Sequence, residues 1–433
     1  MTAGGVRVGL FGLLGSGNIG NDASMESVLH YLRTERPDTY VDAMCPGPAQ
    51  LASAYGIEAT PLWSYQQWKW QGSGISAVAL KVIGKAIDTF RIASWVRRHD
   101  VVIVPGMGVL EATLPLRALG EPYAMFLLSA FGRAFGTKVA FVSIGASVIK
   151  QRLTRWFFNS AARLAFYCSY RDERSREVMR LRNGGALKGR VYPDLAFSNP
   201  IPVGSPGDPG VVAVGVMDFH GSNDERRQAS EIYESYFQNM KSFILWLIDS
   251  GRHVLLFVGD TTGYDDAVVD RMVAELHLDR PAMTTAQVRA VRASSFADVA
   301  RAMAPASAVI ATRFHNVICA LMLSKPTIAI GYAPKHDALM ANMGLPDLCE
   351  PARALDVDRL IEQFTKLQDR APEVRQHLEL RNAELRRQLA TQFEELTMLL
   401  LPASAQPAPG EQRQAGASSA SSGPTRGTPA KRA

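Results

Sequence analysis

The second half of the chain contains a short polar turn that could bind an anion and move a proton. Ala308–Ala311 is apolar, the next five residues run from Thr312 to Asn316, and residues 317–323 are apolar again. A buried guanidinium needs a partner, so Arg313 must pair with a carboxylate of its own domain or with a bound anion. His315 lies at the predicted start of a helix, where an imidazole and free backbone amides suit a phosphate or carboxylate substrate. The alternative is that His315 only begins the helix and has satisfied partners there.

A second cation is expected at the same edge of the sheet. Lys335 follows the predicted strand Thr327–Ile330, twenty residues after His315. Because the carboxyl ends of adjacent parallel strands lie together, we expect Lys335 to face His315. Arg155 follows the predicted strand Lys138–Ile144 in the first half of the chain. It either reaches the same cleft from the opposite side or lies on a helix surface.

A glycine-rich turn near the N-terminus is another candidate for anion binding. The sequence from Gly15 to Gly20 matches G-x-G-x-x-G between a predicted strand and a predicted helix, and Asp42 stands where dinucleotide sites carry a ribose-binding acid. Two simpler explanations are that Asp22 caps the helix, or that the glycines permit a tight turn against a cleft. The cleft-facing candidates of this turn are Gly17, Asn18, Gly20 and Asp22.

Short aliphatic runs alternate with helical periods along the chain, which predicts parallel strands joined by crossover helices. A segment rich in Pro and Gly interrupts the alternation at residues 198–210. We therefore expect an α/β protein with two Rossmann-like domains facing a cleft, residues 1–197 and 211–401, with helices over Asp356–Leu400 and a disordered tail over residues 402–433. The main predicted strands are Val6–Gly12, Thr39–Met44, Val101–Val104, Lys138–Ile144, Val211–Val216, His253–Val258, Ala308–Ala311 and Thr327–Ile330.

The composition excludes several classes of protein. Hydrophobic residues make up 47% of the 433 residues and charged residues 20%, as expected for a globular core. The net charge is +6, and the residues after Pro402 contribute half of it. The rest of the chain is close to balanced in charge, so no broad nucleic-acid surface is expected. The four cysteines are far apart in sequence and indicate neither a metal site nor a disulfide framework. Without a signal-peptide pattern or an apolar run of about 18 residues, a cytoplasmic protein with no transmembrane segment is expected.

From about Val8 to Leu345, the chain resembles the polysaccharide pyruvyl transferase family. The resemblance depends on an ordered set of motifs, of which Arg313-Phe314-His315 is the most specific. The other motifs are Gly17-Asn18-Ile19-Gly20-Asn21-Asp22-Ala23, Tyr170-Arg171-Asp172-Glu173-Arg174-Ser175, Pro193-Asp194-Leu195-Ala196-Phe197, and the Lys325-Pro326 turn that leads to Tyr332 and Lys335.

The resemblance implies a GT-B-like fold and transfer of a pyruvyl group from phosphoenolpyruvate to two hydroxyls of a sugar, forming a ketal. It implies His315 as the general acid and Arg155, Arg313 and Lys335 as donor-binding residues. Phosphoenolpyruvate is then a co-substrate, and the scheme needs no cofactor and no metal because the cations neutralise the phosphate. The implied acceptor is a saccharide or a lipid-linked saccharide of a cell-surface polymer. That role is compatible with contact at the inner face of the cell membrane.

Three other functions remain open from the sequence. A nucleotide-sugar glycosyltransferase of similar fold would use the same basic cleft. A dinucleotide-dependent oxidoreductase would use the glycine turn together with Asp42. A noncatalytic carbohydrate- or anion-binding protein would keep the cleft without the reaction. The segment Trp63–Trp70 could stack on sugars, lie on a membrane surface or pack on the core.

Overall fold

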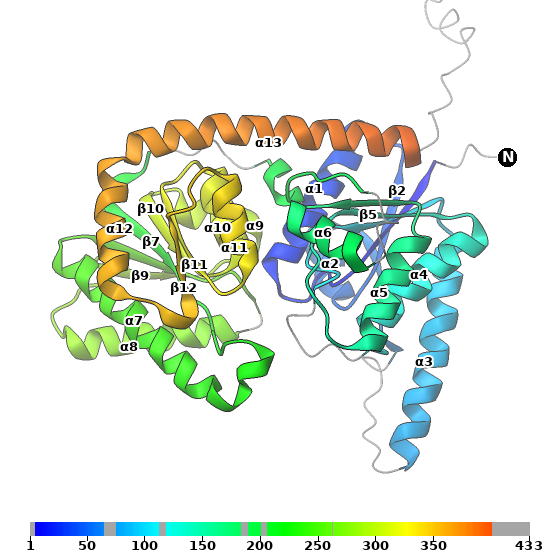
Figure 1. Ribbon diagram of the computed structural model, residues 1–433, viewed down its shortest axis with the longest axis horizontal. Coiled ribbons are helices and arrows are strands. Elements are labelled where there is room, and N and C mark those ends of the chain that lie inside the picture. The colour runs from blue at the N-terminus through cyan, green and yellow to red at the C-terminus, as the bar shows by residue number, and fades with distance from the viewer. Residues whose placement is uncertain are drawn as a thin grey trace, which may run out of the picture.

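The computed structural model describes residues 5–64, 75–111, 118–182, 189–200, 206–261 and 263–400. They form two domains, each built around a parallel sheet covered by helices (Figure 1). The first sheet has the order β3-β2-β1-β4-β5-β6. Its strands are β1 (Arg7–Phe11), β2 (Tyr40–Cys45), β3 (Glu58–Pro61), β4 (Val101–Pro105), β5 (Lys138–Ile144) and β6 (Tyr167–Tyr170).

The second sheet repeats this arrangement, with the order β12-β11-β10-β7-β8-β9. Both sheets have the Rossmann order, in which the strand order reverses beside the first strand of the domain. β4 and β10 are buried along their whole length, as expected for aliphatic runs in a parallel sheet covered on both faces. The strands are β7 (Asp208–Gly215), β8 (His253–Phe257), β9 (Val288–Val291), β10 (Ala306–Ala311), β11 (Thr327–Gly331) and β12 (Cys349–Pro351).

Helices connect successive strands in both domains, and the short 3-10 helix η2 (Leu195–Ser198) follows the last strand of the first domain. The helices of the first domain are α1 (Ile19–Glu35), α2 (Pro48–Tyr55), α3 (Ile75–Val96), α4 (Glu121–Phe135), α5 (Arg152–Leu164) and α6 (Glu173–Arg182). Those that follow are α7 (Ala229–Asp249), α8 (Tyr264–Asp279), α9 (Phe296–Met303), α10 (Phe314–Met322), α11 (Pro334–Asn342), α12 (Val357–Asp369) and α13 (Ala371–Leu400).

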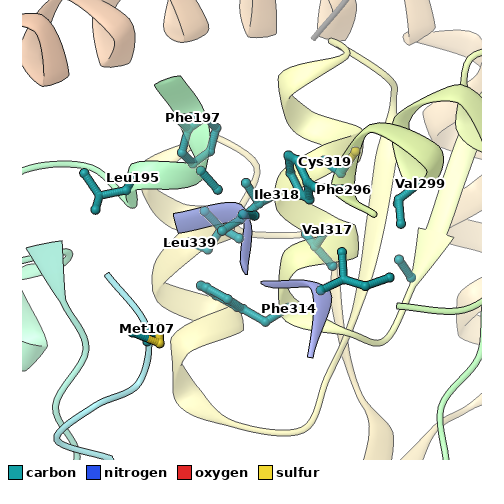
Figure 2. Close-up of a cluster of buried hydrophobic side chains, with 14 of the residues drawn as sticks. Met107, Leu195, Phe197, Phe296, Val299, Phe314, Val317, Ile318, Cys319 and Leu339 are labelled. Carbon is teal, nitrogen blue, oxygen red and sulfur yellow. The ribbon is translucent and has the colours of Figure 1, made fainter. Parts of the chain in front are cut away.

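The interface between the domains contains a packed apolar cluster. Figure 2 shows Leu195 and Phe197 of the first domain in one cluster with Phe314, Ile318 and Leu339 of the second. All five side chains are buried. The two domains are therefore in direct contact where η2 meets α10 and α11.

Helix α13 runs across both domains (Figure 1). Its first half is anchored to the second domain, where Asn382 Nδ2 donates to the carbonyl oxygen of Leu321 at 2.8 Å. Its second half is anchored to the first domain, where Gln392 Nε2 donates to Ser169 Oγ at 2.8 Å. The ring of Phe393 also stacks on Tyr31, with their centroids 4.5 Å apart. The last helix of the chain thus holds both domains.

The fold that the sequence predicts is confirmed: two Rossmann-like domains are followed by C-terminal helices. The eight main strands are present within a few residues of their predicted bounds. Of the other four described strands, β3, β9 and β12 were not predicted, and β6 was expected only as part of the continuing alternation of helix and strand, without bounds. Residues 201–205 of the predicted linker, residues 65–70 of the Trp-rich segment and the predicted tail from residue 402 lie outside the described residues. None of the described helices is both long and apolar enough to cross a membrane.

Candidate active site

The turn between β10 and α10 places a histidine at the carboxyl edge of the second sheet. β10 ends at Ala311, Arg313 has an extended conformation at the N-cap position, and α10 begins at Phe314. His315 is therefore in the first turn of α10. Thr312 fixes this turn, because its Oγ1 lies 2.7 Å from the hydroxyl of Tyr236 on α7.

The imidazole of His315 lies between the domains among charged groups. Its side chain is 14% exposed, and its Nε2 is 3.9 Å from Asp194 Oδ2 of the first domain. Nε2 is buried and has no hydrogen-bond partner among the described residues. Burial lowers the pKa of His315 to about 4; the positive charges of Arg171 and Lys335 act in the same direction, and Asp194 opposes them. The imidazole is neutral at pH 7 in this state.

The glycine turn of the first domain packs directly on this histidine. A side-chain carbon added at Gly20 would overlap the imidazole ring, so only glycine fits there. Asn18 caps α1, because its side chain accepts from the backbone N–H of Gly20 at 3.0 Å. Asp22 instead accepts from the backbone N–H of Gly15 at 2.8 Å, and burial raises the pKa of this carboxyl to about 6.

The same turn also bonds to the second domain. The carbonyl oxygen of Gly17 accepts from the backbone N–H of Thr261 at 2.8 Å, and Asn18 forms a β-bridge with Asp260. The turn thus supplies backbone contacts to the loop after β8 and leaves space for the imidazole. Its four candidate residues, Gly17, Asn18, Gly20 and Asp22, shape the surroundings of the histidine through these contacts.

Arg313 pairs with carboxylates of its own domain, which is one of the two alternatives that the sequence left open. Its Nε and Nη2 donate to the two oxygens of Asp265 at 2.7 and 2.8 Å, and Nη2 is 3.6 Å from Asp260 Oδ2. Asp265 is fully buried. Burial alone would lower the pKa of Arg313, but the hydrogen bonds and charge of Asp265 hold it above its ordinary value. This pair fixes the β10–α10 turn against α8.

A network of opposite charges joins the domains around the imidazole. Arg171, which follows β6, donates to Glu111 Oε1 and to Asp194 Oδ2, the latter at 3.2 Å. Lys335, in the first turn of α11, donates to the second oxygen of Glu111 at 3.4 Å. The ring of Phe314 lies 4.8 Å from the guanidinium carbon of Arg171 and 5.1 Å from the ammonium of Lys335. Two cations therefore share one carboxylate and one aromatic ring.

The charges in this network are stable at neutral pH. Burial raises the pKa of Glu111, but the charges of Arg171 and Lys335 bring it down to about 2. Burial lowers the pKa of Lys335, but attraction to Tyr332 and Glu111 reverses the effect and leaves that pKa above its ordinary value. The neutral imidazole therefore sits beside two permanent cations.

A cavity of about 170 Å³ opens beside the network. Its wall includes Arg171 and Asp194 of the first domain, Phe314 and Lys335 of the second, and Arg381 of α13. The wall also includes Asp172, so three cations and two carboxylates line the cavity; His315 is not part of the wall, but Asp194, 3.9 Å from its Nε2, is. The size of the cavity and its lining suit a small ligand that carries more than one negative charge.

Two residues singled out in the sequence lie elsewhere. Arg155 is half-buried on α5, and its Nη1 donates to the carbonyl oxygen of Ile149 at 3.5 Å; the described contacts do not bring it to His315. The carboxylate of Asp42 accepts from Trp95 Nε1 at 3.0 Å and lies 2.8 Å from His99 Nε2. Asp42 is therefore engaged within the first domain, which argues against a ribose-binding role.

Three residues of the site were not predicted from the sequence as site residues. Arg171 and Asp194 belong to the motifs Tyr170–Ser175 and Pro193–Phe197, so the resemblance carried a signal for both. Glu111 has no comparable signal. It follows the turn at Gly108, where a side-chain carbon would collide with the Glu111 carboxylate.

No group of three or more His, Cys, Asp or Glu side chains in the described ranges is placed to hold a metal ion. What the site does contain is a neutral imidazole, paired carboxylates and cations at the meeting point of two Rossmann-like domains. That arrangement suits binding of a small anionic substrate together with transfer of a proton.

Solved structures share this two-domain fold. The UDP-GlcNAc 2-epimerase of Neisseria meningitidis, bound to UDP-GlcNAc, has a TM-score of 0.55 at 12% identity, covering 90% of this chain and 99% of that one. A putative UDP-N-acetylglucosamine 2-epimerase of Listeria monocytogenes has a TM-score of 0.54 at 11% identity, with 90% and 97% covered. The apo form of the lipopolysaccharide outer core galactosyltransferase WaaB has a TM-score of 0.50 at 11% identity, with 89% and 100% covered. The fold is therefore GT-B-like.

The family is defined by a sequence comparison. The family model named polysaccharide pyruvyl transferase matches residues 18–334, which is most of the chain. The match begins at the glycine turn and ends at Pro334, so it includes His315, Glu111, Arg171 and Asp194 and stops one residue before Lys335. This chain belongs to the polysaccharide pyruvyl transferase family. No curated protein matches the sequence.

Proposed function

We propose that this protein transfers the pyruvyl group of phosphoenolpyruvate to two hydroxyls of a saccharide, forming a cyclic ketal and releasing phosphate. The observation that carries the proposal is the unpartnered Nε2 of His315 beside Arg171 and Lys335 in a member of this family. The donor carries a carboxylate and a phosphate, and its reaction begins with protonation of a carbon. Both requirements match a buried imidazole next to two cations.

The donor is proposed to lie in the cavity lined by Arg171, Lys335 and Arg381. Arg171 can bind a planar carboxylate or a phosphate through two donors, whereas Lys335 supplies a point charge. Both now bond to Glu111. The anionic groups of the donor would compete with Glu111 for them, so Glu111 holds the two cations in place while the site is empty.

His315 is proposed to become the general acid only when the donor is bound. Its pKa of about 4 in the empty site leaves the imidazole neutral. A ligand with several negative charges placed within a few ångströms favours the imidazolium and raises this pKa toward neutrality. Donor binding should therefore take up a proton, which titration calorimetry in buffers of different ionisation enthalpy measures.

The chemistry then follows in two stages. His315 gives its proton to the methylene carbon of phosphoenolpyruvate, and the neighbouring carbon becomes an oxocarbenium centre that the first sugar hydroxyl attacks. The hydroxyl proton returns to the imidazole. Cleavage of the carbon–oxygen bond to phosphate gives a second oxocarbenium centre, and phosphate leaves with the proton held by the imidazole. The second hydroxyl then closes the ketal and gives its proton to the imidazole. Arg171 and Lys335 stabilise the charge on the departing phosphate.

The test is phosphate release from phosphoenolpyruvate, screened against a panel of glycosides as acceptors. Wild-type protein should release phosphate with at least one acceptor. His315→Ala should reduce the rate by about 100-fold or more, because general acid catalysis contributes roughly 10²–10⁴-fold. A rate within about threefold of wild type would remove His315 from this role.

The fold neighbours suggest one rival function. The Neisseria meningitidis epimerase with this fold binds UDP-GlcNAc, and WaaB is a galactosyltransferase. Binding of a UDP-sugar with no phosphoenolpyruvate turnover across the acceptor panel would therefore favour a glycosyltransferase.

A further inference from the structure

One helix layer of the first domain exposes large apolar side chains. α3, α4 and α5 pack side by side in this layer (Figure 1), and Tyr123 of α4 contacts both Phe157 of α5 and Thr89 of α3. Phe90 on α3 is 77% exposed and Trp156 on α5 is 53% exposed. The other exposed apolar residues on α3 and around α5 are Val82, Ile83, Val148 and Leu153.

The exposed residues of α3 form one stripe. Val82, Ala86 and Phe90 follow each other at intervals of four residues, so they lie on the same side of the helix. Ile92 and Trp95 lie on the buried side. The stripe faces away from the core, and exposed apolar groups of this kind usually mark an interaction surface.

The apolar residues around α5 stand in a strongly basic segment. From Gly145 to Leu164 the chain contains four basic residues and no Asp or Glu. The basic residues are Lys150, Arg152, Arg155 and Arg163, and all of them except the half-buried Arg155 are exposed. Exposed Leu153 and Trp156 alternate with these cations along the first two turns of α5.

We propose that the outer face of α3 and α5 is a docking surface for an anionic lipid bilayer. Apolar side chains that enter the interface and basic residues that meet anionic headgroups are the two components of such binding. A second copy of this chain fits less well, because a symmetric contact through this face would bring the basic segment of one copy against that of the other. Among the described residues of α3 and α5 the acid is Asp88, and its side chain is buried, so it does not compensate the basic charges at the surface.

The position of the basic segment links this surface to the site. The segment begins at Gly145, where a side-chain carbon would collide with Arg171 and Glu111. Docking through Val148, Leu153 and Trp156 would therefore hold the edge of the cleft close to the lipid headgroups. If the proposed function is correct, this geometry suits an acceptor saccharide carried on a lipid; the docking itself does not depend on that function.

Sedimentation with vesicles tests the proposal. Full-length protein should bind vesicles of phosphatidylglycerol and phosphatidylcholine and should bind vesicles of phosphatidylcholine alone more weakly. The double variant Phe90→Glu with Leu153→Glu should lose about tenfold or more in affinity, because it removes apolar area and adds negative charge. Leu278→Glu is the matched control, since Leu278 is similarly exposed on α8 of the second domain.

The basic residues are tested in the same assay. Arg152→Glu should weaken binding to the anionic vesicles by about fivefold or more, the size expected for a basic residue at such a surface. Arg370→Glu, on the exposed C-cap of α12, should not. All proteins keep the basic C-terminal tail, so the comparison isolates the helix layer.

Two outcomes would overturn the proposal. One is that the double variant and Arg152→Glu bind the anionic vesicles as tightly as wild type while their thermal stability is unchanged. The other is a dimer in solution that the double variant converts to a monomer. Phosphate release with water-soluble glycosides should be the same in wild type and in all four variants, so a failure of docking is distinguishable from a failure of the proposed reaction.

Discussion

β4 and β10 occupy the same place in their sheets, but the residues that follow them have different chemistry. After β4 the chain reaches Glu111, a carboxylate with a pKa of about 2, and after β10 it reaches His315, an imidazole with a pKa of about 4. The first domain adds Arg171 and the second adds Lys335, and both cations meet at Glu111. Neither domain holds the site alone. The comparison shows that two sheets with the same strand order can place different functional groups after equivalent strands, and that these groups together form one site between the domains.

The largest expected effect concerns the pH dependence of stability. Because the pKa of His315 is about 4 in the folded protein and near 6.5 when unfolded, the unfolded chain binds a proton between these values that the folded protein does not. Stability is therefore fully present above pH 6.5 and falls as the pH approaches 4, by about 3 kcal/mol from this residue. His315→Gln should remove that part of the loss in urea unfolding experiments.

The pH dependence of stability must be compared between wild type and His315→Gln, because other groups titrate in the same pH range. The pKa of His336 is lowered to about 3 by burial and shifts stability in the same direction. The pKa values of Asp22 and Glu26 in the first domain are raised to about 6 and 7 by burial, and these residues act in the opposite direction. If the free energy of unfolding depended on pH to the same extent in wild type and His315→Gln, the imidazole would be more solvated than the structure shows.

The second prediction tests how closely the two domains must approach. Gly20→Ala should reduce phosphate release by about 100-fold, because the added methyl group displaces the imidazole, and a shift of about 1 Å can cost that much. Gly210→Ala is the control, since its backbone is not left-handed and the added carbon would meet only the exposed side chain of Asp208, at 3.3 Å. If Gly20→Ala retained wild-type turnover, the ring would not need to remain where it is.

The smallest expected effect separates Lys335 from Arg155, two of the three cations that the resemblance implies as donor-binding residues. Lys335→Met should raise the apparent KM for phosphoenolpyruvate by about tenfold, as expected for loss of one charged hydrogen bond. Arg155→Met should leave that KM unchanged if the donor occupies the cavity, because Arg155 is not among the residues that line it. An equal rise in both variants would extend the donor site to α5.

The central strands could be predicted from the sequence, and the edge strands could not. β4 and β10 are continuous aliphatic runs because both of their faces are buried. β3, β9 and β12 are edge strands of three or four residues with at most one fully buried position each. A strand this short and this exposed has too few apolar residues to show the alternating pattern by which strands are recognised in a sequence.

The site could be predicted only where it depends on local sequence. His315 at the start of a helix follows from the change of polarity after β10. The partners of the basic residues cannot be predicted from the local sequence, because Asp265 is 48 residues from Arg313 and Glu111 is 224 residues from Lys335. The period of a helix or strand says nothing about which distant carboxylate will meet a given cation. Only the packing of the two domains decides that.

The path of α13 has a consequence for the order in which the protein is made. The helix is synthesised after both sheets, yet its second half covers Tyr31, Ser143 and Ser169 of the first domain. The first domain is therefore made with that face uncovered, because Gln392 follows its partner Ser169 by 223 residues. The packing of the first domain is complete only after both sheets have been synthesised.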